Sequence, residues 1–489
     1  MSVSASAISR VTGVAVQYKN FNAGAAQMLS QRLAVFGTGN HDTEYSTEKY
    51  ECQGSAAEIG ERYGYGSPLH LAARQLFPVM GSGASFPVTF YPQAEAEDAI
   101  QAAGAIGCTG AATESGSGTV SIGGVDADFA ITSGENAAAV LAKIKDAIDG
   151  VLYMPVTAGS VADGSLPLTS KAAGTVGNLI KINVDCDVDG LVFTTTAMAN
   201  GAIDPDISDS LNEIGDVWET AILSCYKYDV TTLLDKYLTF GKDRWSDLNK
   251  KPLIVFHGCT DDYATRTAIT DARPTDYINA LVVSVGSTEL PYVIAAKAMV
   301  NDILTTADSN PAQGYKGLLE GLKAGSDGEQ ETYSVRNQSV KKGSSTNIKN
   351  GSVAELNDIV TMYHPTAEGN MPSRRYVVDL IKLENVVYNV RLIMESDELK
   401  GAPLVEDNTV TSNKAAVQPK TIKTMFLNLA RSLADKAIIQ DTDFTKENME
   451  VAIDSSNPKR LNVSFPVKLS GNVEVTSTDV YFGFYLGGN

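Results

Sequence analysis

The sequence predicts a multidomain protein with an α/β core, a β-rich insertion and a C-terminal α+β domain. Three observations predict this class. Short apolar runs alternate with helical patterns before residue 94 and after residue 206, which is typical of a parallel sheet covered by helices. The segment between them is rich in Gly and Ala and shows period-two alternation, which favours strands. The last third places two amphipathic helices before a series of short strands.

The α/β core is expected in two pieces, 21–93 and 207–332. In the first piece, LAVFG (33–37) and FPVTFY (86–91) predict buried strands, and SAAEIGERYGYGSPLHLAARQLF (55–77) predicts two helices broken at the Gly-Tyr-Gly-Ser turn. In the second piece the patterns predict helix 209–223, strand 251–258, helix 261–272, strand 278–286 and helix 289–304.

The insertion is expected to span residues 94–206. It holds four basic and 15 acidic side chains, with no Arg and no His. Runs such as 118–131 and 178–195 alternate like strands, and ENAAAVLAKIKDAI (135–148) has helical spacing, with Gly150 to end the helix. A module inserted at loop tips adds outer surface without disturbing the core, so we expect this acidic domain on the outside of the molecule.

The C-terminal α+β domain is expected to span residues 333–479. Its polar beginning, 333–372, predicts a strand or two. Apolar residues three and four apart predict helices over 374–396 and 419–438, and the remainder reads as a β-meander with turns at SSNPK and SGN. Short arms, 1–20 and 480–489, flank the folded domains.

Composition excludes several classes of protein. A formal charge of −19 over 489 residues removes the electrostatic attraction to nucleic acid or anionic lipid, so we expect neither as a partner. No apolar run approaches the ~20 residues of a membrane span, and the N-terminus does not read as a signal peptide. Five cysteines without CxxC spacing favour reduced thiols that fill the core.

Candidates for catalysis or metal binding are few. His257 ends a predicted strand, where α/β enzymes often place functional groups, but no carboxylate or nucleophile is tied to it by a known spacing, so we interpret it as structural. DCDVDG (185–190) resembles the start of a calcium loop but lacks the glutamate at position 12. The glycine-rich stretches lack the lysine of a phosphate-binding loop. We therefore predict no enzyme, no metal and no cofactor.

LAVFG and the helix pair broken by Gly64 to Ser67, together with SRRYVVDLIKLENVVYNVR (373–391), resemble the contractile-tail sheath proteins of Mu-like bacteriophages. The order of parts is similar to theirs over nearly the whole chain. The resemblance implies a subtilisin-like core, although the His and Ser motifs of a subtilisin triad are absent here. It also implies a structural protein of the virion tail, assembled in the host cytoplasm. Such a protein polymerises as helically stacked hexameric rings around an inner tube and contracts to drive the tube through the host envelope. The implied partners are further copies of the chain, the inner tube protein, and baseplate and tail terminator proteins.

In that family the two chain ends are arms that add strands to a sheet in a neighbouring subunit. Both ends of this chain are compatible with strand addition, which uses main-chain bonds for affinity and alternate side chains for specificity. The expected exchange residues are Val11, Val14, Val16, Val480, Phe482 and Phe484. Such contacts are heterologous, so they propagate as open helical assemblies.

The family's C-terminal domain faces the inner tube. On the helix expected at 419–438, Lys420 and Arg431 lie about 20° apart and Lys423 about 60° away, so the three share a face. We expect this face to meet acidic patches on the tube; the alternative is an ordinary solvated helix face.

Two other functions stay open at this point. A degenerate subtilase-like hydrolase would use His257 as a base beside a serine. A surface adhesin built on the β-rich module would need export, which the N-terminus does not favour.

Overall fold

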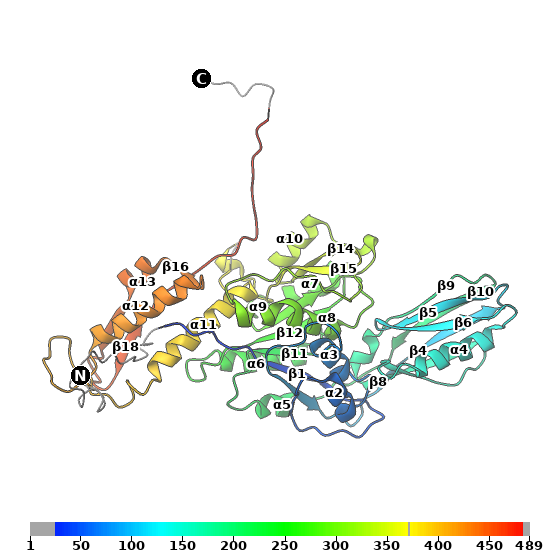
Figure 1. The fold of residues 1–489 in the computed structure, drawn as a ribbon, viewed down its shortest axis with the longest axis horizontal. Helices are drawn as coiled ribbons and strands as arrows, with labels where there is room; N and C mark the ends of the chain where they lie inside the picture. The colour runs from blue at the N-terminus through cyan, green and yellow to red at the C-terminus, as the bar shows by residue number, and fades with distance from the viewer. Residues whose placement is uncertain (1–24, 370–371, 483–489) are drawn as a thin grey trace, which may run out of the picture. The chain divides into compact units, whose positions relative to one another are not determined.

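The structure is a computed structural model described for residues 25–369 and 372–482. The described residues form two compact units, one of residues 25–27 and 389–470, the other of residues 28–388 and 471–482 (Figure 1). This division falls at 388/389 rather than at the expected domain boundary of 333.

The larger unit is built on a six-stranded sheet in the order β13-β12-β11-β1-β3-β2. All neighbours are parallel except β2, which is antiparallel to β3. Every residue of β1, β3, β11, β12 and β13 is buried, as a parallel sheet covered on both faces requires. The strands are β1 (Leu33–Thr38), β2 (Tyr50–Glu51), β3 (Val88–Gln93), β11 (Ala221–Ser224), β12 (Ile254–Cys259) and β13 (Asn279–Val283).

Helices cover both faces of this sheet. Alternate residues of β1 belong to two different cores, Leu33 and Val35 to one and Ala34 and Phe36 to the other. Helices α3 and α8 pack on the first face, and α5 and α6 on the second. The helices are α2 (Ala56–Tyr63), α3 (Pro68–Leu76), α5 (Ser208–Glu213), α6 (Thr231–Arg244), α7 (Tyr263–Asp271), α8 (Pro291–Ala298) and α9 (Leu304–Ser309), with a π-helical turn (Met299–Ile303) between the last two.

The expected helix pair, the buried strands and the parallel sheet are confirmed, but the helix predicted over 209–223 is wrong. Helix α5 ends at Glu213, and Gly215 has a φ of +56°, a left-handed conformation that stops a helix. The apolar residues that follow form the buried strand β11 in the middle of the sheet.

The segment between β3 and β11 forms its own antiparallel sheets, β10-β4-β8-β7 and β6-β5-β9, with α4 packed against them (Figure 1). The β-rich reading and the helix near 135–148 are confirmed. The strands are β4 (Gln101–Gly110), β5 (Gly116–Ile122), β6 (Val125–Ile131), β7 (Val156–Ala158), β8 (Ser165–Ala173), β9 (Ile182–Cys186) and β10 (Leu191–Ala199), and the helices are α4 (Ala137–Asp149) and a 3₁₀ turn (Thr175–Leu179).

Residues 326–388 complete the larger unit. Main-chain bonds tie them to the parallel sheet, since Met362 N–H donates to Asn279 O at 2.9 Å. The elements are α10 (Tyr333–Lys341), the hairpin β14 (Thr346–Asn350) and β15 (Val353–Asp358), 3₁₀ turns (Asp327–Glu329 and Thr366–Glu368) and α11 (Val377–Met394). The expected strands are confirmed, whereas the sequence pattern did not predict α10. The chain passes from one unit to the other within α11.

Within the described residues, the smaller unit is an α+β arrangement of the end of α11, two further helices and two short antiparallel pairs, β16–β19 and β17–β18. The apolar stripe expected on α12 is buried at Ile422, Phe426, Leu429 and Leu433. The elements are α12 (Pro419–Asp435), β16 (Ile439–Gln440), α13 (Thr442–Asn448), β17 (Glu450–Ile453), β18 (Leu461–Ser464) and β19 (Lys468–Leu469). Across the described residues of both units, every helix is too short or too polar to cross a bilayer.

Candidate functional site

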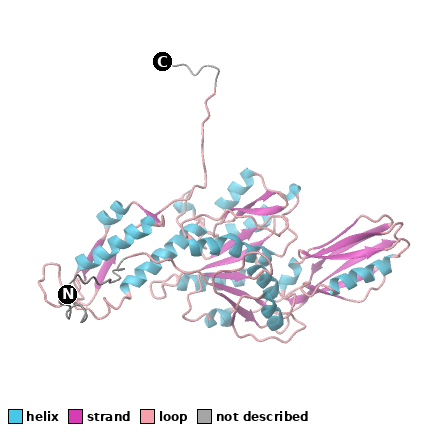
Figure 2. Ribbon diagram, viewed as in Figure 1, coloured by secondary structure: helices cyan, strands magenta, loops and turns pink. Residues whose placement is uncertain are grey.

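The C-terminal segment 475–482 presents apolar side chains to solvent. Val480, Tyr481 and Phe482 are 78%, 82% and 93% exposed. Figure 1 draws the segment as an extended trace, and Figure 2 colours it as loop. The prediction that the meander ends in a strand is therefore wrong for residues 475–482, because none of the described residues forms a β-ladder with this segment. An exposed apolar run of this kind marks an interaction site or an aggregation hazard.

The hairpin of β17 and β18 in the smaller unit offers open strand edges. Four residue pairs join the strands, from Glu450 with Ser464 to Ile453 with Leu461. In the described residues each strand has a partner on one side only, so the outer edges leave backbone N–H and C=O groups free to pair. A two-stranded sheet is marginal on its own, and this one is supported by α12, where Phe426 meets Phe465 at 5.0 Å between ring centroids.

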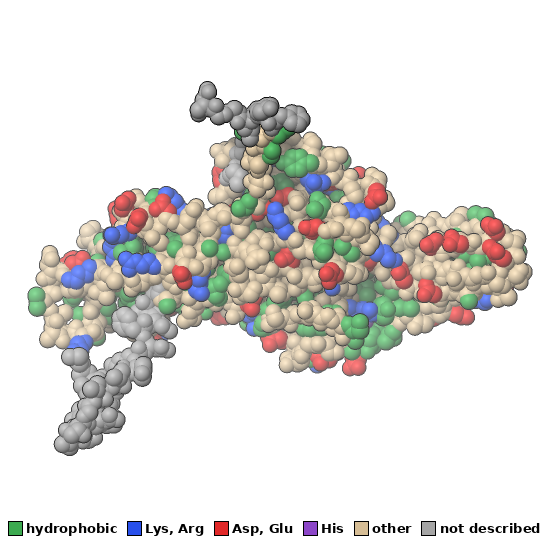
Figure 3. Space-filling view, turned by 45° about the horizontal axis from the view of Figure 1, so that its top comes forward, with side chains coloured by type: hydrophobic (Ala, Val, Ile, Leu, Met, Phe, Trp, Pro, Cys, Tyr) green, Lys and Arg blue, Asp and Glu red, His purple; other side chains and the backbone are tan. Residues whose placement is uncertain are grey.

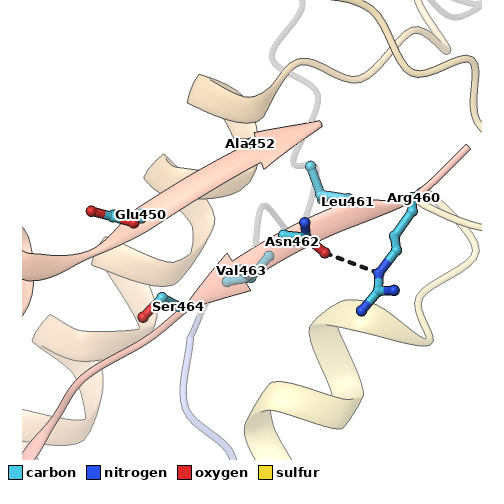
Figure 4. A pocket seen from close by; sticks show the side chains of 7 residues that line it. All are labelled: Glu450, Ala452, Arg460, Leu461, Asn462, Val463 and Ser464. Atoms are coloured by element: carbon cyan, nitrogen blue, oxygen red, sulfur yellow. Dashed lines mark hydrogen bonds between the residues drawn. The ribbon is translucent and has the colours of Figure 1, made fainter. Parts of the chain in front are cut away.

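The two faces of this hairpin differ in polarity. Val451, Ile453, Leu461 and Val463 are half-buried and share one face. The other face is exposed. Residues of both strands line a shallow hollow of about 520 Å³, and Figure 4 shows their arrangement. The lining residues are Glu450, Ala452, Arg460, Leu461, Asn462, Val463 and Ser464.

A tight loop fixes the geometry of the hairpin. Asp454 Oδ1 accepts hydrogen bonds from the N–H groups of Ser456 (2.9 Å) and Asn457 (3.0 Å). Hydrogen bonds from the Ser456 hydroxyl and from Asn462 Nδ2, together with these N–H bonds, lower the pKa of Asp454 well below its ordinary value. Arg460 Nε donates to Asn462 Oδ1 at 3.0 Å (Figure 4). The turn predicted at SSNPK is confirmed, and the alternation on either side of it indicates the hairpin. Its open edges could not be seen in the sequence, because they depend on where every other strand goes.

Four of the predicted exchange residues lie outside the described residues: Val11, Val14, Val16 and Phe484. The two that are described, Val480 and Phe482, are two positions apart, so in an extended chain their side chains lie on the same face. Their exposure is what strand exchange requires, while the exchange itself stays a prediction.

The three basic residues expected to face a tube lie on α12. Lys420 and Arg431 are exposed and Lys423 is half-buried. Each makes a contact within the smaller unit: Lys420 Nζ donates to Asp407 O (2.8 Å), Lys423 Nζ to Met449 O (2.8 Å), and Arg431 Nη1 to Asn428 Oδ1 (3.4 Å). The Lys423 side chain therefore helps to fix the position of Met449, the residue before β17. The tube-facing role of these residues stays a prediction.

His257 is enclosed in the core of the larger unit. Its Nε2 lies 3.0 Å from Asn279 Oδ1, and Asn279 Nδ2 donates to Asp276 Oδ2 at 2.8 Å. Burial lowers the pKa of His257 to about 4. The register partner of His257 on β11 is Ser224, and both side chains are 1% exposed or less. A histidine and a serine thus do lie side by side, but no substrate can reach them without opening the sheet.

The aspartates of the calcium-like stretch 185–190 lie at the end of β9 and in the turn that follows. Among the described residues there is no group of three or more His, Cys, Asp or Glu side chains placed to hold a metal ion. Figure 3 shows Asp and Glu side chains spread over the surface of the β4–β10 segment, in keeping with its acidic composition.

These features define a multidomain α/β protein with an exposed apolar tail and a hairpin whose edges are open. The chain is 27% identical over 417 residues to the tail sheath protein of the Mu-like prophage FluMu from Haemophilus influenzae, and the match covers 83% of each chain. The resemblance indicated by the sequence is thereby confirmed.

Solved structures of sheath tail proteins are also similar to this chain. One is a sheath tail protein from Listeria innocua, with a TM-score of 0.48, 10% identity and coverage of 92% of this chain and 94% of that one. Another is a sheath tail protein from Desulfitobacterium hafniense, with a TM-score of 0.44, 12% identity and coverage of 90% and 93%. No protein-family model matches the chain.

Proposed function

We propose that this chain is the structural subunit of a phage contractile tail sheath. The observation that carries the proposal is the similarity to the FluMu tail sheath protein over 83% of both chains, because a match of that extent includes the core, the insertion and the C-terminal region together. The subunit polymerises as stacked hexameric rings around an inner tube in the virion tail, after assembly in the host cytoplasm. It works without a cofactor and is not an enzyme. Its further partners are the tube, baseplate and terminator proteins.

Strand exchange explains how such rings are joined. The C-terminal arm of one copy adds a strand to an open edge of the β17–β18 hairpin of another copy, and the N-terminal arm of a third copy adds to the other edge. Main-chain bonds then satisfy edges that are open in the single chain. Val480 and Phe482 extend the half-buried apolar row of the hairpin. Burying a side chain such as Phe482 contributes about 1.5–3 kcal/mol, so the tail gains stability only in the assembly.

The finer parts of the proposal follow the same resemblance. The parallel sheet is the subtilisin-like core, and the 94–206 segment is an outer domain. The proposal keeps the division expected from the sequence, into arms (1–20 and 480–489), a discontinuous core (21–93 and 207–332) and a tube-facing domain (333–479), while residues 333–388 pack in the same compact unit as the core. The parallel order of β11, β1 and β3 supports the core assignment. During contraction, the arms act as hinges that stay attached while the subunits rotate as rigid bodies.

The alternatives are less well supported. A hydrolase would need His257 and a serine to meet a substrate, and both His257 and Ser224 are buried. An adhesin built on the β4–β10 segment would leave the open hairpin and the apolar tail without a role.

Cross-linking between copies tests strand exchange. One batch of protein carries Phe482→Cys and another carries Val451→Cys, on the apolar face of β17 that Phe482 is proposed to join. A disulfide requires Cα atoms about 4.4–6.8 Å apart, so it forms only where an arm lies on the hairpin. We expect cross-linked pairs from the mixture. Leu248→Cys, at an exposed loop position of the larger unit, is the control partner for Phe482→Cys. Equal yields from the two mixtures would contradict exchange at this hairpin.

A further inference from the structure

The first described residues of the chain are held at their backbone by side chains of the smaller unit. Gln27 N–H donates to Asn389 Oδ1 at 2.7 Å, and Asn389 Nδ2 donates to Gln27 O at 2.8 Å. Ala26 N–H donates to Ser432 Oγ at 2.8 Å. An amide that both accepts from and donates to one residue satisfies the backbone as a neighbouring β-strand would. Asn389, which is 2% exposed, is therefore a two-point clamp on the root of the N-terminal arm.

The root of the C-terminal arm is held in the larger unit. Lys382 Nζ donates to Asn472 Oδ1 at 2.6 Å, and Asn472 Nδ2 donates to Ala312 O at 2.9 Å. Two residues later, Glu474 pairs with Lys316 at 3.0 Å. Asn472 and Glu474 are half-buried, whereas the residues from 475 to 482 are exposed. The anchored chain therefore ends at Glu474, and the free arm begins there.

Side chains of α11 hold both chain ends: Asn389 binds the backbone of Gln27, and Lys382 binds Asn472. Asn389 and Lys382 are seven residues apart, about two helical turns. Lys382 is fully buried and its ammonium group also lies 3.4 Å from Asp379 Oδ1. Burying a lysine ammonium group costs free energy unless its N–H donors have hydrogen-bond partners. The bond from Lys382 to Asn472 therefore stabilises both α11 and the start of the C-terminal arm.

We propose that α11 sets the free length of both terminal arms, with Asn389 and Lys382 as the positioning residues, and thereby sets the spacing between subunits in the assembled sheath. The proposal rests on the proposed function. Loss of the Asn389 clamp leaves this end of the chain on the single bond from Ala26 N–H to Ser432 Oγ, and when that bond opens the N-terminal anchor is the next bond along the chain, Leu29 N–H on Asn385 Oδ1 (2.9 Å). Two more residues are then free, which adds roughly 7 Å of reach. Neighbouring subunits linked by a longer arm are no longer held at one distance.

The test compares Asn389→Ala and Asn472→Ala with Leu392→Ala, an exposed position on the same helix. Hydrogen exchange on the protomers is expected to quicken roughly tenfold at Ala26 and Gln27 in the first variant and around 472–474 in the second. Electron microscopy is expected to show tubes of irregular repeat from both, and regular tubes from Leu392→Ala. Insertion of two glycines before Ala25, with the clamp intact, is expected to reproduce the irregular repeat without faster exchange at Gln27.

Regular tubes from variants that show fast amide hydrogen exchange at residues 26–27 or 472–474 would overturn the inference. Hydrogen-exchange rates that stay unchanged in both variants would also overturn it. Wild-type protein that forms no tubes would overturn the proposed function, and the inference with it. Where Asn389→Ala fails to fold, Asn389→Asp replaces it, because it keeps the acceptor for Gln27 N–H and removes only the donor to Gln27 O.

Discussion

Gly124, in the turn between β5 and β6, lies directly against the buried carboxylate of Glu289 at the start of α8. A Cβ at Gly124 would be 1.8 Å from Glu289 Oε2, and one at Gly123 would be 3.1 Å from Leu290 Cδ1. Close by, Lys181 Nζ donates to Ser287 O at 2.8 Å. The β-rich insertion therefore packs on the core through a glycine turn in which a side chain at Gly124 would have to displace the Glu289 carboxylate.

Gly124→Ala is expected to destabilise the protein by about 1–3 kcal/mol, because the new methyl group overlaps the carboxylate and the residue has a φ of +83°. Chemical unfolding measures the change. Gly134→Ala is the matched control, since Gly134 has a similar φ of +88° and open space around its Cα. Equal losses in the two variants would show that backbone strain alone accounts for the effect.

Glu289 makes this junction sensitive to pH. Burial raises the pKa of Glu289 from 4.5 to about 7, opposed by its bond from Lys323 N–H and by the Lys323 charge, and reinforced by Asp126. A raised folded pKa means that the stability contributed by the protonated carboxyl is complete below pH 4.5 and is lost as the pH rises through 7.

Glu289→Gln is therefore expected to match the wild type near pH 4.5 and to be more stable at pH 8, by at most about 3 kcal/mol. The glutamine oxygen still accepts from Lys323 N–H. Unfolding free energies at the two pH values measure the difference. A variant that loses the same stability as the wild type between them would show that another group is responsible.

The basic face of α12 provides a test of tube binding. Charge reversal at Lys420, Lys423 and Arg431 is expected to give sheaths that assemble without a tube or contract early, while the protomer stays folded. Each exposed pair contributes only about 0.2–1 kcal/mol and weakens with salt, so the hold comes from repetition over many subunits. Electron microscopy of tails is the measurement.

The control is reversal at Lys400, Lys414 and Lys446, which are exposed in the same unit and give the same change in net charge. Stable, extended, tube-filled tails from the first triple variant would remove α12 from the tube interface. Empty tails from both triple variants would point to net charge rather than to this face.

Local patterns predicted the elements whose structure depends on neighbours in sequence. The break at Gly64 to Ser67 is confirmed because Gly64 and Gly66 have positive φ and Ser67 caps α3 by accepting from His70 N–H. The sequence pattern places β11 in a helix because the four residues Ala221–Ser224 are too few to show a period, and the break after α5 depends on the left-handed Gly215.

The site was harder to predict than the fold. Asn389 contacts a residue 362 positions earlier in the chain, and its spacing on α11 is that of any polar residue on a half-buried helix. The tail at 475–482 is rich in the β-branched and aromatic residues that are typical of a strand, so the sequence could not show that the segment lacks a strand partner among the described residues. The Asn389 contact and the unpaired tail both depend on which distant segments meet in the fold, and the spacing of apolar residues along the sequence does not predict such contacts.

Negative-stain electron microscopy of the purified chain, beside a form that ends at Glu474, tests the strand-exchange assembly most directly. The full chain is expected to form tubes or stacked rings. The shortened form keeps the anchored root at Asn472 and Glu474 but lacks Val480 and Phe482, so it is expected to stay as folded protomers. Tubes of normal diameter and repeat from the shortened form would contradict assembly through the C-terminal arm.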